Sequence, residues 1–202
     1  MHMNELLNGE LEKLAAQVGT RELDILETGC IRNGGEQYRI NDGWSTWTFA
    51  KWVKDNGGMS MSIDLDVSVA HMVLMRDGLM EDSPGLEPTE EGQIVTDGIH
   101  LHQGYSVDVL VKTLSKCGPS SFDMILLDSD NDPNLILHEF FVAKHLVREG
   151  GVILIDDVGG TEGDATKGDA IVPWAQTHSI PYRTLTRTGD GYVTSVVVLE
   201  MP

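Results

Sequence analysis

Short apolar runs rich in β-branched residues alternate along this chain with segments whose apolar residues recur at helical spacing. This alternation is typical of a layered α/β domain built on a mainly parallel sheet. The predicted strands cover residues 23–27, 59–65, 99–102, 122–127, 152–155, 182–188 and 192–199. Because 202 residues suit one domain and are few for two, we expect a single domain over 1–202.

The predicted connections between these strands are mostly helical. An N-terminal helix within 1–20 would end at Gly19, and Ser45 is a candidate N-cap for a helix over 44–55. Residues 81–97 hold two prolines and two glycines, which favours a loop or lid. Gly189-Asp190-Gly191 between the last two strands indicates a hairpin.

The charge balance narrows the possible partners. The chain has 32 Asp and Glu against 14 Lys and Arg, a formal net charge of −18. Such a surface repels phosphate groups, so we expect neither nucleic acid nor an anionic membrane as a partner. No apolar run approaches the roughly 20 residues that cross a bilayer, and two cysteines are too few for a disulfide framework. The N-terminus lacks the layout of a signal peptide, and we expect a cytoplasmic protein.

Acidic residues follow four of the five predicted parallel strands, where open α/β sheets bind their ligands. Glu27-Thr28-Gly29 ends the first strand in a turn that either approaches a ligand closely or is simply tight. Asp64 ends the second strand, where a carboxylate can bind both hydroxyls of a ribose or cap the next helix.

The most specific group of acids is Asp128, Asp156 and Asp157, after the fourth and fifth strands. If those strands are neighbours, their ends lie about 4.8 Å apart and the carboxylates converge. Converging carboxylates repel one another unless a cation lies between them. Oxygen ligands select a hard divalent ion such as Mg²⁺, so we expect either a metal site or three solvated turn residues.

From Leu23 onward the chain resembles the class I S-adenosylmethionine-dependent methyltransferases. The segments that carry the resemblance are ILETG, SIDLD, HQGYS, FDMILLDSD and REGGVILIDDV. Within that class, LETGCIRNGG with the DSD and DD pairs resembles the metal-dependent O-methyltransferases of the macrocin and catechol types. The resemblance implies a Rossmann-like, doubly wound, mostly parallel seven-stranded sheet with a C-terminal antiparallel hairpin.

The resemblance also assigns roles to individual residues. It implies that Asp128, Asp156 and Asp157 bind Mg²⁺, and that Asp128 and Asp130 are catalytic, with Asp130 as the general base. The implied S-adenosylmethionine-binding residues are Glu27, Thr28, Gly29, Cys30, Ser45, Asp64, Gly104, Tyr105, Ser106 and Asp128. Independently of the resemblance, we expect residues 32–42 and 81–97 to form walls or a lid that exclude water.

The expected function is therefore Mg²⁺-dependent O-methylation of a small hydroxylated molecule. The alternatives are a metal-independent small-molecule methyltransferase and a non-catalytic module that binds S-adenosylmethionine. A nicotinamide dehydrogenase is disfavoured, because G-x-G-x-x-G is missing and the chain ends in a hairpin. The sequence leaves open which acceptor is methylated and whether the protein forms a homodimer.

Overall fold

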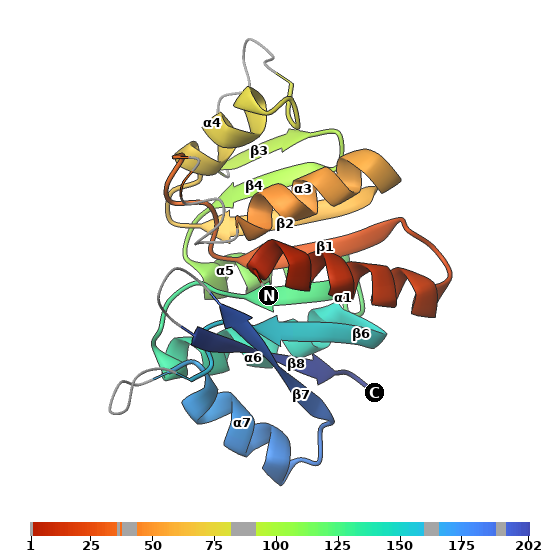
Figure 1. The fold of residues 1–202 in the computed structure, drawn as a ribbon, viewed down its shortest axis with the longest axis vertical. Helices are drawn as coiled ribbons and strands as arrows, with labels where there is room; N and C mark the ends of the chain where they lie inside the picture. The colour runs from red at the N-terminus through yellow and green to blue at the C-terminus, as the bar shows by residue number, and fades with distance from the viewer. Residues whose placement is uncertain (1, 36, 38–43, 82–91, 160–165, 189–192) are drawn as a thin grey trace.

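A single eight-stranded sheet organises the chain, in the strand order β3-β4-β2-β1-β5-β6-β8-β7 (Figure 1). The computed structural model describes residues 2–35, 37, 44–81, 92–159, 166–188 and 193–202. The strands are β1 (Leu23–Thr28), β2 (Gly58–Asp64), β3 (Gln93–Thr96), β4 (Ile99–Gln103), β5 (Phe122–Leu127), β6 (Val147–Ile155), β7 (Tyr182–Thr188) and β8 (Val193–Glu200). The helices are α1 (Met3–Val18), α3 (Ser45–Asn56), α4 (Ser68–Arg76), α5 (Ser106–Cys117), α6 (Pro133–Leu146) and α7 (Gly168–Thr177).

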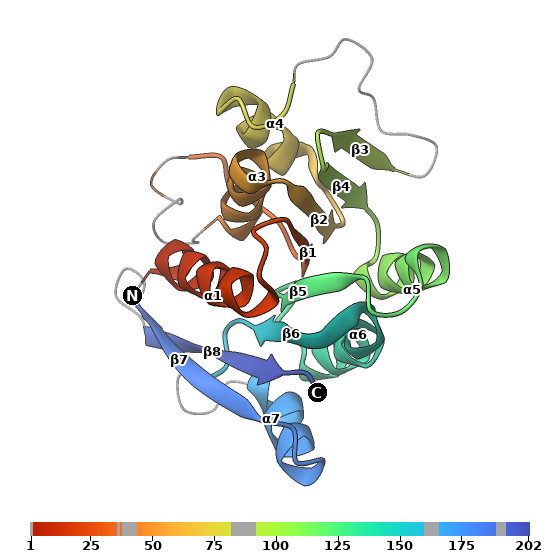
Figure 2. The same cartoon turned by 90° about the vertical axis from the view of Figure 1, so that its right-hand side faces the viewer.

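Helices cover both faces of the sheet, as Figure 2 shows. The central strands are buried on both sides, and their residues alternate between two cores with the period of two that a strand imposes. In β5, Ile125 and Leu127 pack into the core under α5, α6 and α7. Met124 and Leu126 point the other way, into the core under α1 and α3. A third apolar cluster joins α3 and α4 to β3 and β4.

The register of the parallel strands levels their carboxyl ends. Thr28 in β1 is paired with Ile63 in β2 and with Leu127 in β5, and Leu127 is paired in turn with Ile155 in β6. The chain winds from β1 through β2 to β4 and then crosses to the other side of β1, so the strand order reverses between β1 and β5. Ligand sites of open α/β sheets lie at such a reversal.

The predicted fold class is confirmed, with one strand more than expected. Part of the predicted loop at 81–97 is β3, which pairs antiparallel with β4. Asp97 and Gly98 join the two strands with φ of 43° and 80°, the two positive values that a type I′ turn requires. This Asp-Gly pair is a hairpin signal that the sequence prediction passed over. Residues 82–91, the rest of that predicted lid, lie outside the described residues.

Two other predictions of local structure need comment. The N-cap of α3 is Trp44, in the left-handed conformation, and not Ser45, which is the first residue of the helix. The antiparallel register of β7 and β8 confirms the predicted C-terminal hairpin. Its predicted turn at Gly189–Gly191 lies outside the described residues. Residues 36 and 38–42 of the predicted insertion also lie outside them. None of the helices in the described ranges is long and apolar enough to span a bilayer.

The pairing of β1 with β2 depends on a glycine. Gly58 has a φ of +90°, and a Cβ atom there would lie 2.2 Å from the carbonyl oxygen of Leu23. We therefore expect Gly58→Ala to lower the free energy of unfolding by at least about 2 kcal/mol. In contrast, Gly9 lies on the exposed side of α1, and a Cβ atom there would have no atom within 4 Å. Gly9→Ala should therefore raise the free energy of unfolding by about 0.5–1 kcal/mol. Urea unfolding of both variants checks this pair, and a stable Gly58→Ala protein would contradict it.

Candidate active site

Three carboxylates meet at the carboxyl edge of the sheet. Asp128 follows β5, and Asp156 and Asp157 follow β6, so the pairing of Leu127 with Ile155 brings the three residues side by side. One oxygen from each carboxylate lies within 4.8 Å of the others. Asp156 is only 2% exposed, and Asp157 has a φ of 52°, a conformation that is uncommon outside glycine and often found at functional sites. The structure thus assembles the predicted cluster.

A cavity of about 350 Å³ lies in front of these carboxylates, and we call it the acidic cavity. Its lining residues are Cys30, Ile31, Arg32, Trp44, Ser45, Asp128, Ser129, Asp130, Asn131, Asp156, Asp157 and Lys167. Asp130 is exposed here, and its carboxylate accepts a hydrogen bond from the backbone N–H of Asp132 (3.1 Å). The acidic cavity therefore presents carboxylates to any molecule that enters it.

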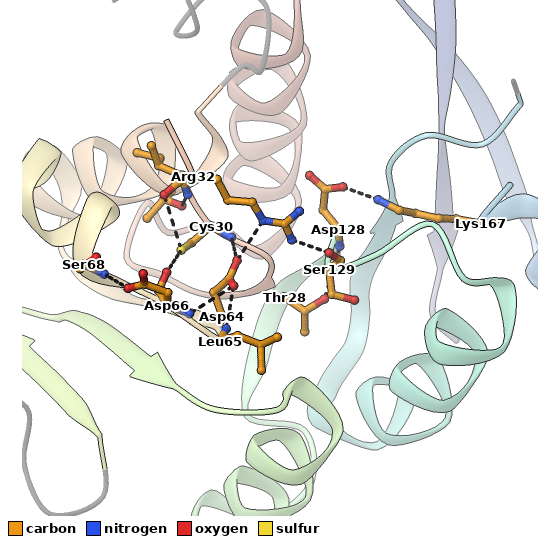
Figure 3. A network of polar contacts seen from close by, with 12 residues as sticks. Thr28, Cys30, Arg32, Asp64, Leu65, Asp66, Ser68, Asp128, Ser129 and Lys167 are labelled. Carbon is orange, nitrogen blue, oxygen red and sulfur yellow. Dashed lines mark hydrogen bonds and ion pairs between the residues drawn. The ribbon is translucent and has the colours of Figure 1, made fainter. Parts of the chain in front are cut away.

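A second cavity of about 290 Å³, which we call the adjoining cavity, lies beyond the ends of β1, β2 and β4. Its lining residues are Gly29, Arg32, Ile63, Asp64, Leu65, Gly104, Tyr105, Ser106, Ser129, Asp130 and Leu135. Arg32, Ser129 and Asp130 line both cavities. In Figure 3 the Arg32 side chain extends between Asp64 and Ser129, contacting the Asp64 carboxylate (3.4 Å) and donating to the Ser129 carbonyl.

Asp64 faces the turn that follows β1. One of its carboxylate oxygens accepts hydrogen bonds from the backbone N–H of Cys30 (3.0 Å), and the other from that of Leu65 (2.6 Å). Asp64 does not cap α4, because the Ser68 N–H donates instead to Asp66 (2.9 Å). The alternative role for Asp64 as a helix cap is thereby removed.

Gly29 brings the turns after β1 and β5 into contact. Its φ is +85°, and a Cβ atom at this position would lie 2.3 Å from the carbonyl oxygen of Asp128. The Gly29 N–H donates to the carbonyl of Ile63 (2.8 Å). Only a glycine fits this close approach, which keeps the ends of β1, β2 and β5 together.

Glu27 and Thr28 are buried and are not among the residues that line the two cavities. Glu27 is 1% exposed and accepts a hydrogen bond from the Ser62 hydroxyl (2.6 Å). Burial raises the pKa of Glu27 to about 7, against hydrogen bonds from three hydroxyl groups that lower it. The other eleven predicted site residues each line one or both cavities.

The sequence analysis assigned no role to two buried ionisable residues of the site. Lys167, 2% exposed, forms an ion pair with Asp128 (Figure 3). Burial alone would lower the pKa of Lys167, but Asp128, with smaller contributions from Asp156 and Asp157, outweighs burial and raises it. Lys167 is therefore an ammonium ion and not a base. Nothing in the sequence pattern indicates this contact.

Glu139, on α6, is the second unpredicted residue. It is fully buried and accepts a hydrogen bond from the Thr28 hydroxyl (2.9 Å), and the hydroxyls of Ser106 and Ser129 also face it. Burial raises its pKa, against those hydrogen bonds. A signal was available, because helical spacing places Glu139 on the same inward face as Ile136 and Ala143. An acid on an apolar helix face indicates a buried polar network.

The thiol of Cys30 does not suit nucleophilic chemistry. Burial raises its pKa well above the ordinary value, and the carboxylates of Asp64 and Glu27 raise it further. Only the thiolate of a cysteine is a good nucleophile. Cys30 therefore contributes its backbone N–H and its shape to the site.

The comparisons with known proteins identify the family of this chain. Residues 40–158, more than half of the chain, match a family model described as a methyltransferase domain. The chain belongs to this methyltransferase family. This membership and the fold confirm the resemblance to the class I S-adenosylmethionine-dependent methyltransferases. No curated protein is significantly similar to the methyltransferase in sequence.

Solved structures share the fold of the methyltransferase at low sequence identity. A putative O-methyltransferase from Klebsiella pneumoniae is 18% identical, with a TM-score of 0.62 over 96% of this chain and 80% of its own. An O-methyltransferase from Bacillus cereus in complex with SAH is 18% identical, with a TM-score of 0.59 over 95% and 79%. TomG from Streptomyces achromogenes, in complex with SAM and involved in tomaymycin synthesis, is 20% identical, with a TM-score of 0.58 over 95% and 77%.

The raised pKa of Glu27 predicts a pH dependence of stability. The pKa of Glu27 lies near 7 in the folded state and near 4.5 in the unfolded state. Between these pH values the folded protein therefore binds more protons than the unfolded protein, and the free energy of unfolding falls as the pH rises. Glu27→Gln removes the ionisable group, so it should raise the free energy of unfolding by an amount on the order of 2–3 kcal/mol at pH 8 and change it little at pH 5. Urea unfolding at both pH values measures this.

The matched control for that experiment is Glu22→Gln, an exposed acid that precedes β1. It removes the same charge from the surface and should leave the pH dependence as in the unmodified protein. Parallel stability curves for the unmodified protein and Glu27→Gln would show that the Glu27 carboxyl is not protonated on folding.

Proposed function

We propose that this methyltransferase transfers the methyl group of S-adenosylmethionine to a hydroxyl oxygen of a small molecule, with Mg²⁺ held by Asp128, Asp156 and Asp157. The observation that carries the proposal is the convergence of these carboxylates beside a cavity that Asp130 also lines. The adjoining cavity shares a wall with the acidic cavity, so a donor and an acceptor could lie next to each other.

The carboxylate cluster fits Mg²⁺ in both chemistry and spacing. Mg²⁺ prefers oxygen ligands at about 2.1 Å in an octahedron, which puts ligand oxygens about 3.0–4.2 Å apart. The three carboxylates, within 4.8 Å of one another, need only a small closure to reach that geometry. A divalent ion bound there would lower the pKa of an alcohol coordinated to it and fix the position of its oxygen.

The adjoining cavity suits the nucleoside part of the cofactor. Asp64 lies at its wall, where its carboxylate would accept hydrogen bonds from both ribose hydroxyls. Tyr105, which is 50% exposed, offers a ring against which adenine would stack, and Gly104 and Ser106 complete that side. The methionine part would then extend past Gly29, Cys30 and Ser45 into the acidic cavity.

Asp130 is suited to take the proton from the acceptor. It is exposed and lines both cavities, so it lies on the boundary where the acceptor oxygen would meet the methyl group. Lys167 cannot take this role while Asp128 keeps it charged. The sulfonium of the donor is positive, and the carboxylates around the acidic cavity stabilise such a charge.

A second candidate function is methyl transfer without metal. The observation that favours it is the ammonium group of Lys167, which already contacts Asp128 and supplies a positive charge to the cluster. In that case Asp128 and Asp156 would orient the cofactor or acceptor only. Chelation separates the two candidates, because metal-free protein would then keep full activity.

Cofactor binding gives the first test. Titration calorimetry with S-adenosylhomocysteine should detect binding to the unmodified protein, and Asp64→Ala should weaken it roughly tenfold to a hundredfold through lost hydrogen bonds to a charged group. Asp66→Ala is the matched control, because Asp66 lies two residues away and accepts from Ser68 outside both cavities. It should keep the original affinity. Absence of binding to the unmodified protein, with and without Mg²⁺, would refute the proposed cofactor site.

Metal dependence gives the second test. We expect Asp157→Asn, which keeps a residue tolerant of the left-handed backbone, to lower methyl transfer at least about a hundredfold while leaving S-adenosylhomocysteine affinity within about twofold. Transfer is measured with methyl-labelled cofactor and a panel of neutral phenols and glycosides, before and after chelation and with Mg²⁺ restored. Collapse of cofactor affinity in Asp157→Asn would show that this residue binds the cofactor. Cofactor binding with no transfer to any acceptor would favour a non-catalytic module.

A further inference from the structure

Two features of the position of Lys167, its burial and its place at a helix N-terminus, are unfavourable for a charged lysine side chain. Its side chain is 2% exposed, and it is the N-cap residue of α7, at the positive end of the helix dipole. Burying an ammonium group costs free energy unless a charged partner is close. The structure keeps the lysine there, so the carboxylates around it must offset both costs.

The helix itself does not need Lys167 at this position. The start of α7 is closed by a local motif, in which both the backbone N–H (3.0 Å) and the hydroxyl (3.1 Å) of Thr166 donate to the Asp169 carboxylate. This motif fixes the backbone on both sides of Lys167. The lysine side chain is therefore free to serve the acidic cavity, which it lines.

Lys167 offsets part of the negative charge of the carboxylate cluster. Asp128, Asp156 and Asp157 bring three negative charges within 4.8 Å, and Lys167 brings one positive charge in contact with Asp128. The ammonium group thus relieves part of the repulsion between these carboxylates.

We infer that Lys167 is an internal counter-ion that holds Asp128, Asp156 and Asp157 together before metal binds and lowers the affinity of this site for divalent cations. The inference rests on the proposed function, because it concerns the same metal site. A divalent ion bound to Asp128 would lie only a few ångströms from the ammonium, so the two cations repel each other. The lysine therefore makes the metal-free cluster more stable and the metal easier to lose.

The test is a titration with Mn²⁺ followed by electron paramagnetic resonance, which measures the free ion directly. Lys167→Gln should bind Mn²⁺ about tenfold or more tightly than the unmodified protein, because one repelling charge is gone. Lys167→Arg keeps the charge and should stay within about twofold. Lys112→Gln, an exposed lysine on α5, removes the same net charge from the surface and should not change the affinity.

Thermal unfolding gives a second signature. Without metal, Lys167→Gln should unfold at a lower temperature than the unmodified protein, and saturating Mn²⁺ should remove most of that difference. A lysine with a purely structural role would lower the unfolding temperature equally with and without Mn²⁺. If Lys167→Gln does not fold, the same measurements are made on Lys167→Met, because a methionine side chain suits a buried position.

The outcomes distinguish this inference from the proposed function. Equal Mn²⁺ affinities in the unmodified protein and Lys167→Gln would overturn the inference and leave the metal site standing. Weaker binding in Lys167→Gln would also overturn it, since Lys167 would then orient Asp128 as a ligand. Absence of Mn²⁺ binding in every variant would overturn both the inference and the metal part of the proposed function.

Discussion

The parallel pairing of β1, β5 and β6 in level register is the constraint on which the site depends. Because Thr28, Leu127 and Ile155 are paired across three neighbouring strands, the residues that follow them emerge at one edge. The same register that assembles a site also concentrates negative charge, and that charge opposes folding unless it is neutralised. Gly29 tightens the arrangement further by letting the turn after β1 touch the backbone of Asp128.

Residues at strand ends could be predicted from the sequence because strand period and strand order together fix where they lie. Asp64, Asp128 and Asp156 each follow an apolar run of recognisable length, and their convergence needs only that the strands be parallel. Lys167 could not be predicted in this way. Its contact with Asp128 spans 39 residues and reaches the sheet from the N-cap of α7, a position that no periodicity marks. The β3 strand was missed for a different reason, since its Asp97-Gly98 turn lay inside a stretch that two prolines and several acids made loop-like.

Buried acids hold the turns of the site from beneath. Glu27 ties β1 to Ser62 in β2, and Glu139 ties Thr28 to α6 while facing the turns at Ser106 and Ser129. Burial raises the pKa of both carboxyl groups, so each lowers stability when it is ionised. An apolar residue at either position would remove that cost, but it would leave the hydroxyls of the turns without acceptors. The site therefore keeps its geometry at the expense of stability, as functional sites commonly do.

In the proposed function, the boundary between the two cavities would link cofactor binding to methyl transfer. Arg32 contacts Asp64 on one side and the Ser129 carbonyl on the other, so a ligand whose ribose takes Asp64 must share or displace this guanidinium. Displacing it would remove one positive charge from the wall that Arg32 and Asp130 have in common. The wall would then be more negative when a sulfonium cofactor lies against it. A more negative wall favours a positively charged donor, and it favours a neutral acceptor over an anionic acceptor. An acceptor that carried a phosphate or carboxylate would meet four aspartates in the acidic cavity, against the two cationic side chains of Arg32 and Lys167.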